Sequence, residues 1–367
     1  MAGWPDSSND QGITLNGALY LENLKVEKLR HIYGNGYDIT IGSGITNPSS
    51  GFYLYGAGRN ELGEKVGKIA VYSGHIERIV GYVRSTGKTI DVENKQACIT
   101  VGGTANVVTI IAGCANGGIE NGNVKINVED GNVTTLVGGN QGFGNQEAAF
   151  SGKTEINISG GTVKDLYAAG SGRGQSIPTY SGSITINMKN GKVDNIYGAG
   201  SAAYVISPDS VNSSSIHINM QGGTVTNIFA AGKGGDAAVT SAADHKVKPS
   251  TFGSLTGDVE ILLGGDAAVT NIYASGEGFY KDGYTYDTTE NAYLDGNVTI
   301  TLEGNAKVKD SVYGGGKGID KEGYAACARV ESTSVVKLFV KGNATIAGNV
   351  YGLSLIHISE PTRLRRI

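Results

Sequence analysis

The chain has 367 residues, of which 58 are glycine and only 6 are proline, and 17% of the residues are charged, with a formal net charge of −4. Glycine is present at about twice its usual share while proline is scarce, and this combination excludes a collagen-like chain and a proline-rich disordered chain. The glycines must therefore serve turns. There is no basic stripe, and the longest apolar run, near 107–115, is less than half of the roughly 20 residues of a membrane span, so we expect neither a nucleic-acid partner nor insertion into a membrane.

Residues 1–36 contain no secretion signal, because neither a basic start nor an apolar core follows Met1. They end in HIYGNG, from His31 to Gly36, which has the form of half a repeat unit. We therefore expect an incomplete first coil or an N-terminal cap in this stretch. Cys98, Cys114 and Cys327 are too few and too scattered for a disulfide framework or a metal site, and no residue pattern indicates a cofactor.

Residues 37–352 consist of copies of one unit, which predicts a single repeat domain. Weak copies begin at 38, 68 and 97, and clear copies begin at 122, 152, 182, 214, 257, 296 and 334. The clearest pair is GKTEINISGGTVKDLYAAG at 152–170 and GSITINMKNGKVDNIYGAG at 182–200. The length of the unit varies after the Tyr-Gly-x-Gly end, so we expect about ten or eleven coils with variable loops on one edge.

Each unit predicts two strands. In the first half, Ile184, Ile186 and Met188 alternate with polar residues, which is typical of a half-buried strand. A glycine pair then turns the chain. In the second half, Val163 and Leu166 are apolar but three positions apart, and a left-handed bend at Asp165 and its equivalents Asn195, Asn227 and Asn271 would let both side chains point inward.

Such strands can pair as antiparallel hairpins within a unit or as a parallel solenoid between units. The identity of equivalent strands favours the solenoid, an all-β parallel β-helix in which Ile156 and Ile186 are neighbours. Stacking like on like would then form two structural ladders. The first is Asn127, Asn157, Asn187 and Asn219, and the second is Tyr167, Tyr197, Phe229, Tyr273, Tyr313 and Tyr351.

The repeated Gly-Gly-x-Val-x-x-Ile-Tyr-Gly-x-Gly motif resembles the glycine-rich β-helical repeats of large adhesin-like surface proteins of bacteria, which share the pectate-lyase-like architecture. The resemblance covers His31 to Gly352. It implies a right-handed helix, a location outside the cell or on its surface, and a role in adhesion or spacing. Residues 353–367, LSLIHISEPTRLRRI, resemble a translated sequencing adapter, so we expect this tail to lie outside the natural protein and the natural ends to be missing.

Parallel β-helices also include polysaccharide lyases and hydrolases, which place several carboxylates on adjacent coils. In the predicted stacking, Glu155 lies two coils from His217 and at least three from Glu260, which is too sparse for a paired-carboxylate site. We therefore predict no catalytic residues. A carbohydrate-active enzyme acting on acidic polysaccharide is the alternative, and a surface-array protein without a ligand is a third hypothesis.

The insertion from Phe279 to Asp295 is the best candidate for binding. It concentrates Tyr280, Tyr284, Tyr286 and Tyr293 among acidic and amide groups. Exposed tyrosines can stack on sugar rings or on protein partners, so glycans or matrix proteins are the expected ligands. The same rings can instead pack against the rod, and the sequence leaves both interpretations open.

Overall fold

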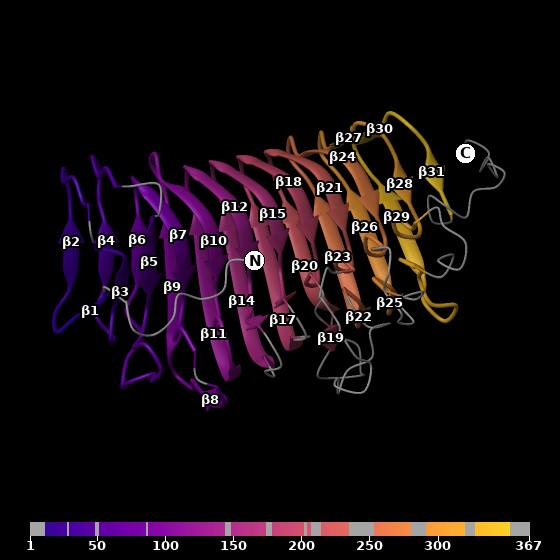
Figure 1. Ribbon diagram of the computed structural model, residues 1–367. Coiled ribbons are helices and arrows are strands. Elements are labelled where there is room, and N and C mark those ends of the chain that lie inside the picture. The colour runs from indigo at the N-terminus through magenta and orange to yellow at the C-terminus, as the bar shows by residue number, and fades with distance from the viewer. Residues whose placement is uncertain are drawn as a thin grey trace.

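The computed structural model is an elongated stack of β-strands (Figure 1), in which the strands follow one another from β2 at one end to β31 at the other. It describes residues 12–27, 29–47, 51–85, 87–143, 148–173, 178–201, 204–206, 214–234, 253–279, 291–319 and 327–352. Within these ranges every regular element is a strand, and no apolar helix of bilayer-spanning length occurs.

Two long sheets contain nearly all the strands, and each pairing between strands is parallel. Sheet A has 14 strands: β1 (Gly12–Thr14), β3 (His31–Tyr33), β5 (Phe52–Tyr55), β7 (His75–Val80), β10 (Asn106–Ile111), β12 (Asn132–Val137), β15 (Thr162–Tyr167), β18 (Lys192–Tyr197), β21 (Thr224–Phe229), β24 (Ala268–Tyr273), β27 (Lys307–Val308), β28 (Val312–Tyr313), β30 (Thr345–Ile346) and β31 (Val350–Tyr351).

Sheet B has 15 strands: β2 (Leu19–Leu21), β4 (Ile39–Ile41), β6 (Ile69–Val71), β8 (Thr89–Asp91), β9 (Gln96–Val101), β11 (Gly118–Val128), β14 (Phe150–Ile158), β17 (Thr179–Met188), β19 (Tyr204–Ile206), β20 (Ser214–Met220), β22 (Leu255–Thr256), β23 (Asp258–Leu263), β25 (Leu294–Asp295), β26 (Val298–Leu302) and β29 (Val336–Val340). A small third sheet pairs β13 (Gln141–Phe143) with β16 (Ser171–Arg173).

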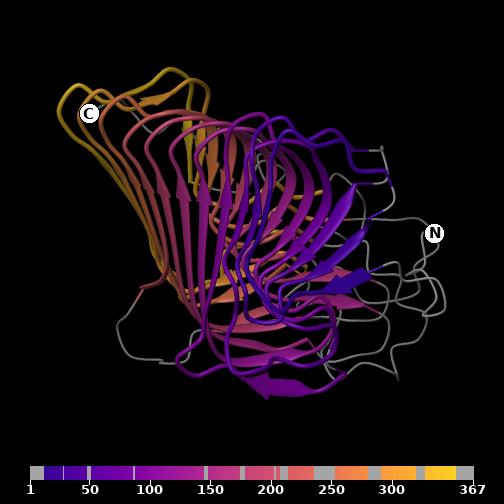
Figure 2. The same ribbon diagram turned by 90° about the vertical axis from the view of Figure 1, so that its left-hand side faces the viewer.

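The chain alternates between the two sheets and adds one layer at each pass, where a layer is one strand of sheet B with the strand of sheet A that follows it. Figure 2, seen from the end where β1 and β2 lie, shows successive passes one behind another. In the register of β14 and β17, Ile156 is paired with Ile186. This confirms the predicted parallel stacking of like on like and excludes the hairpin arrangement for these strands. The fold is therefore all-β and consistent with a β-solenoid.

The core is a continuous column of apolar side chains that runs from Leu15 to Val312. Alternation in sheet B produces it, since Ile156 and Ile158 point inward and are buried while Asn157 between them is half-buried on the outer face. Burying one such branched side chain contributes about 1.5–3 kcal/mol. Because each layer contacts only its neighbours, the stack gains this stabilisation layer by layer.

The predicted left-handed bend at Asp165 is wrong. Asp165 and its equivalents Asn195, Asn227 and Asn271 lie within strands of sheet A, and none of them has a positive φ. The register instead has no pair at the position before each of them, so the strand is irregular there, and Val163 and Leu166 are both buried. The four polar side chains form a ladder, in which Asn195 donates to Asp165 at 2.8 Å and Asn227 to Asn195 at 2.9 Å. Hydrogen bonding along the stack thus replaces the expected bend.

Candidate functional site

The outer face of sheet B carries a ladder of asparagine amides. The Nδ2 of Asn157 donates to Oδ1 of Asn127 at 3.2 Å, that of Asn187 to Asn157 at 3.0 Å, and that of Asn219 to Asn187 at 3.2 Å. At the first step, Asn127 donates to the hydroxyl of Thr100 at 3.4 Å. Every amide therefore donates toward the N-terminal end, and the ladder has a direction.

This direction leads to a prediction for two matched variants. Asn187→Asp loses the donated bond and places a carboxylate oxygen against Oδ1 of Asn157, so we expect the free energy of unfolding to fall by about 1–2 kcal/mol. Asn127→Asp keeps its accepted bond, and the hydroxyl of Thr100 can turn to donate to the new carboxylate, so the loss should stay below about 0.5 kcal/mol. Urea unfolding at neutral pH measures both, and equal losses would contradict the ladder direction.

A charged row runs beside the asparagines. Lys125 and Glu155 form an ion pair of 3.1 Å between neighbouring layers, and hydrogen bonds from Asn157 and Lys125 lower the pKa of Glu155. Two layers further on, Nδ1 of His217 lies 3.1 Å from Oε2 of Glu260. Glu155 and His217 lie two layers apart, as predicted, whereas the His217–Glu260 contact was not predicted. This imidazole–carboxylate pair is open to solvent, with 36% and 55% of the side chains exposed.

Outside the core, the predicted aromatic ladder follows the end of the sheet A strands. Its six rings stack with centroid distances of 4.7–5.1 Å and interplanar angles of 5–15°. The rings belong to Tyr167, Tyr197, Phe229, Tyr273, Tyr313 and Tyr351. This offset stacking adds about 0.5–1.5 kcal/mol per pair beyond burial alone. Burial raises the pKa of the Tyr167, Tyr197 and Tyr273 hydroxyls, so they stay protonated through the neutral range.

The same column contains further rings near the N-terminal end that the sequence interpretation did not identify. Tyr33 and Tyr55 stack at 4.8 Å in this column, and in the column that leads to Asp165 the ring of His31 lies 4.7 Å from that of Tyr53. The guanidinium of Arg84 donates to the hydroxyl of Tyr33 at 2.9 Å. Aliphatic side chains fill the column between Tyr55 and Tyr167, so its aromatic character is interrupted there.

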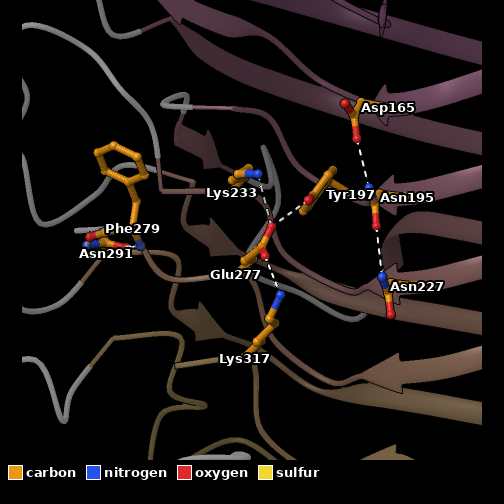
Figure 3. A network of polar contacts seen from close by, with 9 residues as sticks. All are labelled: Asp165, Asn195, Tyr197, Asn227, Lys233, Glu277, Phe279, Asn291 and Lys317. Carbon is orange, nitrogen blue, oxygen red and sulfur yellow. Dashed lines mark hydrogen bonds and ion pairs between the residues drawn. The ribbon is translucent and has the colours of Figure 1, made fainter. Parts of the chain in front are cut away.

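An ion network contacts Tyr197 of the aromatic ladder (Figure 3). Lys233, Glu277 and Lys317 each directly follow a glycine, four residues after a ring of the aromatic ladder, and are paired in parallel across three successive layers. Oε1 of Glu277 is 2.7 Å from Nζ of Lys317, its Oε2 is 3.2 Å from Nζ of Lys233, and the hydroxyl of Tyr197 donates to Oε2 at 2.6 Å. Burial alone would raise the pKa of Glu277, but the hydrogen bonds from Lys317 and Tyr197 and the charge of Lys233 hold it below its usual value.

The network stands at the roots of three inserted segments, 235–252, 280–290 and 320–326. Asn291, which directly follows the second of these segments, is buried. Its side chain accepts a hydrogen bond from the amide of Phe279 at 2.9 Å and donates to the Phe279 carbonyl at 3.0 Å. Because Phe279 and Asn291 flank residues 280–290, this pair of bonds fixes both ends of that segment to one point of the frame (Figure 3).

Of the four predicted ligand contacts, Tyr280, Tyr284 and Tyr286 lie outside the described residues. Tyr293 is half-buried, and the guanidinium of Arg329 lies 5.5 Å from its ring centroid, a cation–π contact between neighbouring layers. Tyr293 therefore packs against the frame. The residues that the sequence interpretation missed are Lys233, Glu277 and Lys317. The signal that could have identified them is their shared position four residues after a ring of the aromatic ladder, where the charge alternates in sign.

No metal centre is evident in the described part of the chain, where no three His, Cys, Asp or Glu side chains gather closely enough to hold an ion. The site thus offers ion pairs, amides and tyrosines at the roots of inserted segments. The chain was compared with protein-family models, with curated proteins and with solved structures, and none of the three comparisons found a match.

Proposed function

We propose that the chain is a non-catalytic scaffold on the cell surface or outside the cell, a right-handed β-helix whose inserted segments bind glycans or proteins. The stacked parallel sheets support a scaffold, because they form a long frame with repeated exits for the chain on one edge. The location and the handedness follow from the resemblance of the repeats to those of adhesin-like surface proteins.

One observation carries the proposal, namely that the roots of three successive insertions are held side by side. The amide of Gly234 donates to the carbonyl of Glu277 at 2.9 Å, and that of Gly278 donates to Lys317 at 2.9 Å. The Lys233–Glu277–Lys317 network ties the same three positions through their side chains. A frame that fixes adjacent roots this closely reduces the ordering cost of forming one composite binding surface from several segments.

Replacing Tyr280, Tyr284 and Tyr286 together with alanine tests the binding role. We expect the signal on an array of glycans and matrix proteins to fall at least about tenfold, because each aromatic stacking contact contributes about 0.5–1.5 kcal/mol. The matched control is the double variant Tyr37→Ala and Tyr72→Ala, which removes exposed tyrosines elsewhere on the frame and should leave the signal unchanged.

Unchanged binding by the triple variant would contradict the assignment of these tyrosines. The alternative function, a lyase or hydrolase of acidic polysaccharide, has the His217–Glu260 pair in its favour. Turnover of polygalacturonate above the blank, with or without calcium, would support that alternative over the scaffold, provided that His217→Ala abolishes it.

A further inference from the structure

Several asparagines of the chain are followed directly by glycine, and such an asparagine is open to attack by the next amide nitrogen, because glycine has no side chain to obstruct it. They are Asn16, Asn35, Asn116, Asn121 and Asn190. Asn190 is the one with a lysine on both sides, in the sequence Lys189-Asn190-Gly191-Lys192. Its side chain and those of both lysines are exposed, in the turn between β17 and β18.

The turn at Asn190 allows a side chain to contact the amide of the next residue. Asp130 occupies the equivalent position two layers earlier, as the strand pairings on both sides of the turn show. There, the amide of Gly131 donates to Oδ1 of Asp130 at 2.9 Å. Gly131 and Gly191 both have a positive φ, +79° and +94°, so the chain turns in the same way at both. The nitrogen of Gly191 is therefore within reach of Cγ of Asn190, which favours a reaction between them.

Hydrogen bonding distinguishes this turn from the Asn-Gly pair at Asn121. Among the residues that the structure describes, neither the side chain of Asn190 nor the amide of Gly191 takes part in a hydrogen bond. Asn121 lies within β11, and its Nδ2 donates to Oδ1 of Asp91 at 3.0 Å. Because that bond fixes the side-chain amide in place, we expect the fold to slow attack on Asn121 but not on Asn190.

The surrounding charge favours Asn190 as well. The attacking nitrogen must lose its proton, so the reacting state is anionic, and the ammonium groups of Lys189 and Lys192 stabilise it. Lys192 is also paired with Asp194 at 3.2 Å, so Lys189 supplies the larger share. The residue before Asn121 is instead Glu120, and the hydrogen-bond partner of Asn121 is a carboxylate. Both negative charges raise the energy of the anion there.

We propose that Asn190 is a site of spontaneous deamidation in the folded protein. The nitrogen of Gly191 loses its proton and bonds to Cγ of Asn190, and the side-chain amide takes up a proton and leaves as ammonia. Water then opens the cyclic imide at either carbonyl group, which yields aspartate or isoaspartate. The chain gains a negative charge, and isoaspartate lengthens the main chain by one carbon between β17 and β18. The reaction requires no ligand, so it is independent of the proposed binding function.

Peptide mapping by mass spectrometry after incubation of the full chain at mildly alkaline pH tests the assignment. It follows the mass gained at each Asn-Gly pair when an amide becomes a carboxyl group. In the folded chain, we expect Asn190 to convert at least about tenfold faster than Asn121, and in urea the two rates should come within about threefold of each other. Equal rates in the folded chain would overturn the proposal. So would an unchanged Asn190 after a time in which a synthetic peptide of residues 186–194 has converted.

Two matched variants test the role of charge. Lys189→Gln should slow the conversion of Asn190 about threefold, because it removes a cation beside the anionic state. Lys153→Gln makes the same change at an exposed lysine of β14 and should leave the rate unaltered. Equal rates in the two variants would contradict the stabilising role of Lys189. Asn190→Gln should abolish the mass gain at this position, and a gain that persists would place the reaction elsewhere. Circular dichroism checks that each variant is folded.

Discussion

Gly182→Ala is expected to lower the free energy of unfolding by more than about 3 kcal/mol. Gly182 lies in β17 with a φ of +147°, a conformation that L side chains rarely adopt. It is paired with Gly152, which is itself paired with Gly122, so three glycine backbones stack directly on one another. A Cβ at Gly182 would overlap the carbonyl oxygen of Gly152. Neither the unfavourable φ nor the overlap with the carbonyl oxygen can be relieved without breaking the register of two layers.

Urea unfolding followed by circular dichroism measures this loss. Gly17→Ala is the matched control, because an added Cβ at this exposed residue meets nothing within 4 Å. Its effect on the unfolding midpoint should be negligible. Similar midpoints for the two variants would show that Gly182 does not hold the close approach of adjacent layers.

Glu277→Gln is expected to lower the free energy of unfolding by about 2–3 kcal/mol. Only 17% of the Glu277 side chain is exposed, and it lies between two lysines while accepting from Tyr197. The amide removes the charge and leaves Lys233 and Lys317 beside a neutral group that cannot accept from all three donors. Lys233→Ala is the control, since Glu277 then keeps Lys317 and Tyr197, and the lost ion pair should cost less than about 1 kcal/mol.

The same residue predicts a dependence on pH. Because the pKa of Glu277 is lowered in the fold from its ordinary 4.5, its ionised form stabilises the protein above that value, and this stabilisation is lost as the pH falls through the folded pKa. The difference in unfolding midpoint between the unmodified protein and Glu277→Gln should therefore be full at pH 7 and shrink in acid. A difference that stays constant down to pH 3 would mean that Glu277 does not titrate with folding.

Much of the frame can be predicted from the sequence because the repeat itself encodes its pairing. Equivalent residues such as Asn157 and Asn187 are adjacent in space because the units that contain them are stacked, so aligning the units yields the register and both ladders. The geometry inside a strand does not follow in this way. Two apolar residues three positions apart suggested a left-handed bend at Asp165, whereas this residue lies within β15 without a positive φ and its side chain belongs to a hydrogen-bonded ladder.

The ion network was harder to predict because insertions separate its members in sequence. Lys233 and Glu277 are 44 positions apart and paired directly, whereas the units that begin at 122, 152 and 182 repeat every 30 residues. Aligning the units from the rings of the aromatic ladder, rather than from their starts, would have placed five residues in one column, namely Ser171, Ser201, Lys233, Glu277 and Lys317.

The exact thirty-residue offset between Gly122, Gly152 and Gly182 bears on how such a molecule can change over generations. Unequal recombination within this stretch removes or duplicates a whole unit. At the new junction, each residue is still followed by the residue type that follows it in the other units. The polypeptide would lengthen or shorten by about 4.8 Å per event with every inward and outward side chain in place. Selection can therefore adjust the length of the stack in steps of one unit without changing the packing of the core.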